Sequence, residues 1–398
     1  MVAQKFTGSF TQQEPLPPEA VAAAVAVLNS GRLHRYNLTA GEAGEVAQLE
    51  VEYRDWQGSA YCLAVTSGGQ ALQIALRAVG VKPGDPVLTN GFTLAPVPGA
   101  IAAVGGHAIL VEIDETLCLD LQDLARKIES SGARFLLLSH MRGHLCDMER
   151  LMQICDAAGV AVIEDCAHTM GAMWNGKKSG NFGKVACFST QTYKHLNSGE
   201  GGFLTTDDAE LAARATILSG SYMLYERHGA GPGAVAFADA RYQMPNCSAR
   251  LDALRAAILR PQLAGLARNI DRWNARYRIV DAGLTSNNAI ATIQRPAAES
   301  CVGSSIQFRL PGFNVDQCKA LLRAAADRGV ELKWFGNAEP VGFTSAHQSW
   351  RYIAAQPMPQ TDGVLATLFD MRLPLTFSEA DCALIATLIC DSVREVAA

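Results

Sequence analysis

The feature that most constrains the fold is a regular alternation of short apolar runs with amphipathic runs over the first two-thirds of the chain. The apolar runs are rich in Val, Ile, Leu and Phe, which is typical of strands buried on both faces. Strands are predicted at 61–65, 86–89, 108–112, 134–139, 160–164, 185–189 and 202–205, and helices near 70–79, 96–104, 120–129 and 147–158. The alternation predicts βαβ units. The fold class is therefore α/β, with a mainly parallel central sheet and helices on both faces.

The length of 398 residues exceeds that of one ordinary core, which favours two domains. A long helical stretch over 250–285 leads into the second domain, and Pro261 should kink or interrupt it. We predict a large α/β domain over 1–260, which includes an N-terminal arm and a helix closed near Gly31. A smaller α+β domain is predicted over 261–398.

Composition argues against several classes of protein. The net charge is -5 and Lys and Arg form no dense run, so no nucleic acid is expected as a partner. No apolar run approaches the roughly 20 residues that cross a bilayer, and no secretory signal is recognised. The 11 cysteines contain no CxxC pair, so neither a disulfide framework nor a metal site is expected. We therefore predict a cytoplasmic protein without a membrane partner.

The first candidate site residues follow a predicted buried strand that ends near Asp165, with His168 three residues further on. In open parallel sheets, ligands bind beyond the carboxyl ends of the strands. A carboxylate at this position can hold the cationic ring nitrogen of pyridoxal 5′-phosphate (PLP), which makes that ring an electron sink. The alternative is a helix N-cap Asp followed by a histidine satisfied in the core.

The second candidate is Lys194, which lies in a polar loop after the strand that ends at Ser189. A lysine at the carboxyl edge of a sheet can react with a ligand aldehyde, and burial would favour its neutral, nucleophilic amine. Ser189 could hydrogen-bond a phosphate oxygen. The alternative is an ordinary surface lysine beside a glycine turn.

The third candidate is the strand-to-helix turn formed by Ser67, Gly68 and Gly69. Its glycines let a ligand approach the backbone, and the start of the helix offers free N–H groups to an anion. Alone, a Ser-Gly-Gly turn is weak evidence. The three strand ends together supply an anion site, a carboxylate and an amine, and one PLP molecule would use all three.

These segments resemble the DegT/DnrJ/EryC1/StrS sugar aminotransferases, a family of fold-type-I PLP-dependent enzymes. The resemblance covers about 15–265. It is carried by ordered motifs: SGGQAL at 67–72, VEIDETLCLD at 111–120, SHMRG at 139–143, IEDCAHTMGA at 163–172, FGKVACFS at 182–189 and SGEGG at 198–202.

The resemblance implies a role for each candidate. Lys194 would bind the cofactor aldehyde covalently and shuttle a proton, Asp165 would pair with the ring nitrogen, and His168 would lie near the phenolic oxygen of the ring. Ser67, Gly68, Gly69 and Ser189 would surround the phosphate.

Three positions depart from the family pattern. Gly69 stands where a Thr is usual, and Leu94 stands where an aromatic residue usually stacks on the ring. The alternatives for that role are the apolar face of Leu94 and the nearby Phe92. Ser248 aligns with an Asn that reaches the phosphate bound by the partner subunit, and Asn246 lies close to it.

The resemblance implies an aminotransferase that acts by a ping-pong mechanism. Its partners would be an amino acid donor, Glu or Gln, and a sugar-like keto or aldehyde acceptor, in a homodimer with shared active sites. The alternatives are another PLP reaction on the same fold, such as a dehydratase or lyase, or a catalytically quiet PLP-binding regulatory protein. Family dehydratases replace the lysine with His, so Lys194 favours transamination.

Overall fold

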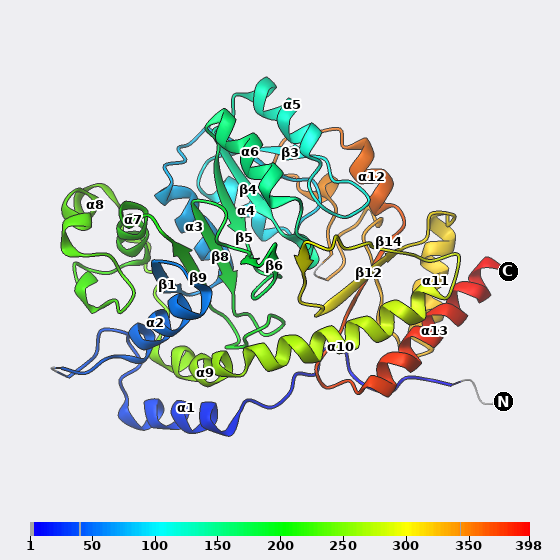
Figure 1. Ribbon diagram of the computed structural model, residues 1–398, viewed down its shortest axis with the longest axis horizontal. Helices are drawn as coiled ribbons and strands as arrows, with labels where there is room; N and C mark the ends of the chain where they lie inside the picture. The colour runs from blue at the N-terminus through cyan, green and yellow to red at the C-terminus, as the bar shows by residue number, and fades with distance from the viewer. Residues whose placement is uncertain (1–3, 40, 343) are drawn as a thin grey trace.

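The computed structural model describes residues 4–39, 41–342 and 344–398, and its centre is a seven-stranded sheet (Figure 1). The strand order is β1-β9-β8-β5-β4-β2-β3. All neighbours from β8 to β3 are parallel, whereas β9 is antiparallel to both β8 and β1. The strands are β1 (Tyr61–Val65), β2 (Pro86–Asn90), β3 (His107–Val111), β4 (Phe135–Ser139), β5 (Ala161–Asp165), β8 (Val185–Ser189) and β9 (Gly202–Thr206). All seven predicted strands are therefore present, and the predicted α/β class is confirmed.

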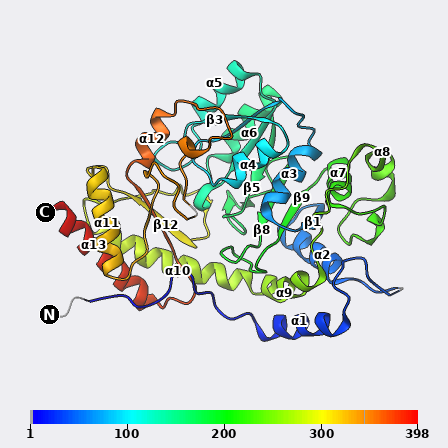
Figure 2. The same cartoon turned by 180° about the vertical axis from the view of Figure 1, so that it is seen from behind.

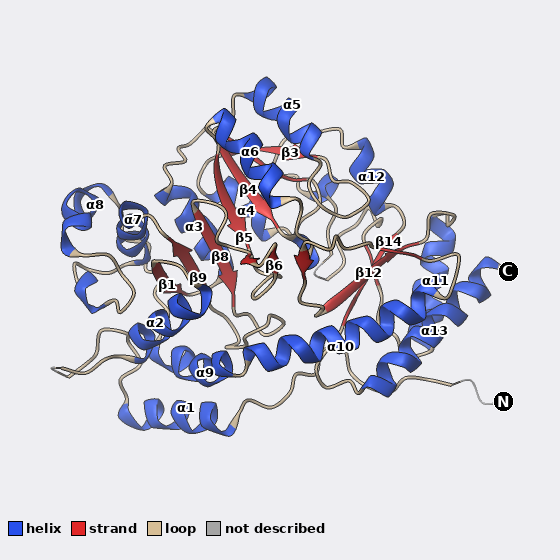
Figure 3. Ribbon diagram, in the orientation of Figure 1, coloured by secondary structure: helices blue, strands red, loops and turns tan. Residues whose placement is uncertain are grey.

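Helices cover both faces of this sheet because its strands are apolar on both sides (Figure 3). One apolar core contains side chains of α3 (Gly68–Ala78), α4 (Pro96–Ala103) and α7 (Ala209–Ser219). The other contains side chains of α2 (Glu45–Gln57), α5 (Leu121–Ser131), α6 (Met148–Ala158) and α9 (Ala253–Ala264). Two more helices pack further out, α1 (Pro18–Ser30) on α9 and α8 (Phe237–Gln243) on α7.

The predicted helical stretch over 250–285 forms two helices that run along one side of the molecule (Figures 1 and 2). The first, α9, continues through Pro261, and the second, α10 (Leu266–Thr285), begins after Gly265. The interruption therefore lies at Gly265, four residues beyond Pro261. Proline lacks the N–H that would bond back to residue 257, but the following turn still closes, and Gly265 ends it.

A separate apolar core surrounds a second sheet, which is four-stranded and antiparallel with the order β10-β12-β14-β13. The strands are β10 (Ala291–Thr292), β12 (Ser305–Arg309), β13 (Lys333–Trp334) and β14 (Leu368–Arg372). Side chains of α10, α11 (Val315–Asp327) and α13 (Glu379–Ala397) fill this core. The early part of α10 contributes to the first sheet's core and its later part to this one. The division into domains at residue 260 stays a prediction.

Short elements complete the fold. A small antiparallel sheet consists of β6 (Met173–Trp174), β7 (Lys177–Lys178) and β11 (Glu299–Ser300). Single 3-10 turns lie at Met141–Gly143, Tyr225–Arg227, Ala234–Ala236 and His347–Ser349. No helix in the described ranges is both long and apolar enough to cross a membrane.

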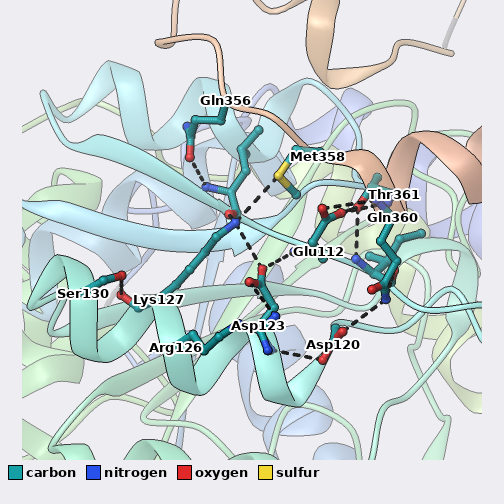
Figure 4. A network of polar contacts seen from close by, with 12 residues as sticks. Glu112, Asp120, Asp123, Arg126, Lys127, Ser130, Gln356, Met358, Gln360 and Thr361 are labelled. Carbon is teal, nitrogen blue, oxygen red and sulfur yellow. Dashed lines mark hydrogen bonds and ion pairs between the residues drawn. The ribbon is translucent and has the colours of Figure 1, made fainter.

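The segment that ends in α12 (Pro359–Leu365) covers the exposed edge of the large sheet at β3 (Figure 4). The Gln356 side chain imitates a neighbouring strand: it accepts from Leu110 N and donates to Ala108 O, both at 2.9 Å. At the start of α12, the Thr361 N–H donates to the buried Glu112 carboxylate at 2.7 Å. An edge strand that would otherwise present unpaired backbone groups is thereby closed by later parts of the chain.

Candidate active site

The candidate site lies at the carboxyl edge of the large sheet, where the parallel strands end in polar residues. Asp165 ends β5, Ser189 ends β8 and Ser139 ends β4, and Ser139 lies directly opposite Asp165 in the ladder. A doubly wound sheet binds ligands at this edge.

Asp165 is buried at the end of its strand and is held from two sides. Its Oδ1 accepts from Ala167 N at 3.1 Å, and its Oδ2 accepts from Ser139 Oγ at 3.3 Å. Ser139 Oγ in turn accepts from Thr93 Oγ1 at 2.7 Å. Burial raises the pKa of the Asp165 carboxyl, against the opposing effects of the Ala167 N–H and the Lys194 charge. The carboxyl group is therefore fixed in orientation and shielded from water, and a cation beside it would find an ion-pair partner in a medium of low dielectric.

Lys194 lies in the loop between β8 and β9, and the loop's own hydrogen bonds fix its shape. Ser198 N donates to Thr190 O at 2.9 Å, and the two hydroxyl groups of these residues lie 2.8 Å apart. Gly201 has φ 151°, and a Cβ at this position would lie only 2.3 Å from Thr190 Oγ1. The glycine turn is therefore a steric requirement of the loop that presents Lys194.

Lys194 and His168 meet at this edge, with Nζ and Nε2 2.8 Å apart. His168 Nδ1 accepts from the Arg142 backbone N–H at 3.3 Å, so the neutral ring carries its proton on Nε2 and donates to the lysine amine. Burial, reinforced by the charge of Lys194, holds the pKa of His168 well below its usual value.

The electrostatic surroundings favour a neutral Lys194 amine. Burial, followed by the charge of Arg142, lowers the pKa of Lys194 to about 7, whereas Asp165 opposes the shift. Part of the side chain still lines a cleft of about 810 Å³, which is also lined by Trp273, Ser304 and Arg372. A substantial fraction of nucleophilic amine is therefore present near neutral pH, at an accessible position.

The predicted anion cradle is formed by the start of α3 against the end of β8. Ser67 caps α3, and its Oγ accepts from Gln70 N at 3.1 Å. A Cβ at Gly68 would lie 2.8 Å from Ser189 Cβ, so the two segments are in close contact. At Gly69 the nearest atom to such a Cβ is Ser67 Oγ at 3.9 Å, so space is open there. The first N–H groups of α3 have no carbonyl partner within the helix and can bind an anion.

Together these groups match the chemistry of PLP. The cradle, in which Gly68 leaves no room for a Cβ, suits a phosphate, the shielded Asp165 suits a cationic ring nitrogen, and Lys194 suits an aldehyde.

Two other residues predicted to contact the cofactor are Leu94 and Ser248. Leu94 packs against an apolar cluster that contains the fully buried Phe92, whose ring stacks edge-to-face on Phe335 at 4.9 Å. Phe92 is therefore a core residue, which weakens it as a substitute for a ring-stacking aromatic. Ser248 is exposed, with left-handed backbone (φ 50°), and its Oγ donates to Asn246 Oδ1 at 3.3 Å.

Sequence reasoning missed several charged residues beside Lys194. Arg142, Lys333 and Arg372 are close enough for their charges to lower the pKa of Lys194. Arg142 stands in the SHMRG motif, directly after β4, and its place at a strand end was the available signal. Lys333 and Arg372 come from the second sheet, and no spacing in the sequence indicated that they face the first.

Comparison with solved structures supports this fold. The S. venezuelae aminotransferase DesV has a TM-score of 0.77 and 28% sequence identity, over 95% of this chain and 94% of that one. A crystal structure of 3-amino-5-hydroxybenzoic acid synthase, at 24% identity and a TM-score of 0.81 over 97% of this chain and 100% of that one, shares the fold. The chain therefore has the architecture of the fold-type-I PLP-dependent transferases.

Sequence comparison narrows this class. Residues 18–387 match the model of the DegT/DnrJ/EryC1/StrS aminotransferase family, so the chain belongs to that family of aminotransferases. The 3-amino-5-hydroxybenzoate synthase of Amycolatopsis mediterranei (strain S699) is 30% identical over 295 residues, or 72% of each chain. The L-glutamine:scyllo-inosose aminotransferase of Streptomyces griseus is 33% identical over 257 residues, which span 64% of this chain and 60% of that protein.

Proposed function

We propose that this aminotransferase uses PLP to move an amino group from glutamine or glutamate to a keto or aldehyde carbon of a sugar-like acceptor. The observation that carries the proposal is the amine of Lys194, which is partly enclosed, lies 2.8 Å from His168 Nε2 and is close enough to Asp165 to interact with its charge. The comparisons do not favour a dehydratase or a quiet regulatory protein. The names of several relatives specify glutamine-dependent or sugar aminotransferases, which supports this donor and this kind of acceptor.

The chain's own residues would hold the cofactor at three points. Ser67, Gly68, Gly69 and Ser189 would bind its phosphate, Asp165 would bind its ring nitrogen, and Lys194 Nζ would bind its aldehyde carbon. When bound, the cofactor supplies an electron sink for the carbon that gains or loses the amino group.

Lys194 would then have a second task, which is to move a proton at its Nζ. A pKa near 7 lets this amine accept a proton and return it without a large energetic cost in either direction. His168 orients the amine through the 2.8 Å contact, and Asp165 would keep the ring nitrogen protonated by its negative charge.

The assembly and location belong to the same proposal. We infer a cytoplasmic homodimer in which Ser248, or Asn246 beside it, approaches the phosphate bound by the second copy. Both residues are exposed, as such a contact requires. Leu94 would offer an apolar surface where relatives stack an aromatic ring.

The test is a half-reaction. Purified protein loaded with PLP is mixed with glutamine or glutamate, without acceptor. The visible absorbance of the lysine-bound cofactor should disappear while one equivalent of the matching 2-oxo acid forms. A bound chromophore that responds to neither donor, nor to the other common amino acids, would contradict the proposal.

A further inference from the structure

Three cations face a single carboxylate beside Lys194, and we call Arg142, Lys333 and Arg372 the cation cluster. The carboxylate is that of Asp370, which is fully buried in β14. Its Oδ2 lies 3.0 Å from Arg142 Nη2 and 3.7 Å from Lys333 Nζ. The cluster thus carries more positive charge than the one acid can balance.

The cluster also contains buried donors without an acceptor. Arg142 is buried, and its Nε has no hydrogen-bond partner, nor has the buried Nζ of Lys333. Asp370 Oδ2 faces these cations at ion-pair distance but makes no hydrogen bond to them, and the carboxylate is held in this position because Gln307 Nε2 donates to its Oδ1 at 2.8 Å and Gln307 Oε1 is in turn bound by His144. Buried charged donors without an acceptor are costly, which indicates a missing anion.

The position of the cluster links this anion to the reaction. The charges of Arg142, Arg372 and Lys333 all reach the amine of Lys194, and Arg372 lines the same cleft as Lys194. The Arg372 guanidinium also lies 3.6 Å from the ring centre of Tyr193, the residue before Lys194. The anion cradle at Ser67 and Ser189 is built from other elements, α3 and β8, so the cluster is not part of it.

We propose that the cation cluster binds a carboxylate on the substrates and that the acceptor is a sugar acid, not a neutral sugar. The inference rests on the proposed function, since it concerns the acceptor of that reaction. In a ping-pong mechanism, donor and acceptor occupy the same space in turn. A neutral acceptor would leave Arg142 Nε and Lys333 Nζ without a charged hydrogen-bond acceptor during half of every cycle.

The chemistry of the cluster favours a carboxylate over a larger anion. A planar guanidinium matches a carboxylate with two parallel hydrogen bonds. Arg142 is buried, so the bound anion must be compact and terminal. The diphosphate of a nucleotide sugar is larger and must continue on both sides, which an enclosed cluster does not allow.

The test uses two unreactive six-carbon probes, D-gluconate and sorbitol, which differ in one carboxylate in place of a hydroxymethyl group. Their affinities are measured by calorimetry on protein loaded directly with pyridoxamine 5′-phosphate, the form that meets the acceptor. Gluconate should bind at least about tenfold more tightly than sorbitol. Equal affinities for the two probes would overturn the proposal.

Four variants locate the binding. Arg142→Gln and Lys333→Gln should each weaken gluconate binding about tenfold or more and leave sorbitol binding unchanged. Arg328→Gln is the matched control, because its ion pair with Glu395 lies at the surface away from the cluster, and it should bind gluconate as the parent does. Thermal unfolding confirms that each variant is folded, and Arg142→Lys should recover part of the affinity. Gluconate binding that neither Arg142→Gln nor Lys333→Gln weakens would contradict the proposal.

The glutamine half-reaction of the same variants tells a carboxylate on the acceptor from the carboxylate of the donor. It also separates a failure of this inference from a failure of the aminotransferase proposal. If only the donor's carboxylate uses the cluster, the variants will slow the glutamine half-reaction while gluconate and sorbitol bind equally, which refutes the sugar-acid inference alone. If no donor yields a 2-oxo acid, the aminotransferase proposal fails. The gluconate measurement still stands by itself, because it does not use the donor.

Discussion

At the scale of single residues, the site depends on how its surroundings change the chemistry of one lysine. Lys194 would be an ordinary surface cation in water, but burial and the charge of Arg142 lower its pKa. The sequence could identify Lys194, Asp165 and Ser189 because each follows an apolar run at a strand end. It could not identify Arg142 as a neighbour of Lys333, since these residues converge from two sheets that no local pattern relates.

The pH dependence of cofactor capture follows from this lysine. The folded-state pKa lies below the ordinary value of Lys, so the amine becomes neutral as the pH rises through about 7. The rate at which apoprotein gains visible PLP absorbance should therefore rise between about pH 6 and pH 8 and then level off. A rate that keeps rising towards about pH 10, where a solvated lysine titrates, would show that the amine is not perturbed.

Asp165 is expected to act through the ring nitrogen, not through binding alone. Asp165→Asn keeps the size of the side chain and its hydrogen bond from Ser139, but it removes the charge that keeps the nitrogen protonated. The variant should still bind PLP, and the glutamine half-reaction should slow by about 100-fold or more. Stopped-flow absorbance measures the rate. A rate equal to that of the parent would remove Asp165 from the proposed role.

At the scale of elements, the site depends on how closely α3 approaches β8. The sequence predicted both elements and their polar ends, because the strand and helix patterns are strong and Ser67 is a favoured N-cap. It did not predict the end of α9 correctly, since Pro261 is tolerated within the helix and Gly265 ends it. Strands as short as β10 and β13 have too few residues for any pattern to be recognised.

The contact between α3 and β8 leaves no room for a side chain at Gly68. Gly68→Ala would place a Cβ 2.8 Å from Ser189 Cβ and 3.3 Å from its Cα, so the cradle must open. PLP affinity should fall by about tenfold. Gly363→Ala is the control, since its Cβ meets open space at an exposed position of α12 outside the cradle, and it should bind PLP almost as tightly as the parent. Titration of apoprotein with PLP checks both, and equal losses would show that the cradle is not where the phosphate binds.

The contacts between the start of α12 and the edge strand β3 lead to a prediction about stability. Thr361→Val removes a hydroxyl that donates to the buried Glu112 and accepts from Ile113 N. The free energy of unfolding should fall by about 1–3 kcal/mol, because a buried carboxylate and an N–H lose a partner. Thr387→Val is the matched control, at an exposed helical position. Urea unfolding measures the difference, and equal effects of the two substitutions would contradict the importance of the edge contact.

At the scale of the whole molecule, the two sheets contribute different chemistry to one place. The large sheet supplies the amine, the acid and the anion cradle, whereas the second sheet supplies Asp370 and two of the three cations. Helix α10 contributes side chains to one apolar core of the large sheet and to the apolar core of the second sheet, and so connects the two sheets (Figure 1). A reaction specificity built from both sheets therefore depends on the complete chain, not on the large sheet alone.

The central claim is the bond between Lys194 and the cofactor, and one measurement tests it directly. Protein loaded with PLP is reduced with borohydride and digested, and the peptides are analysed by mass spectrometry. The expected result is a single modified peptide in which Lys194 carries the mass of the reduced cofactor, and no such peptide from a Lys194→Ala variant. Labelling of a different lysine in the parent protein, or retention of the label in the variant, would contradict the account.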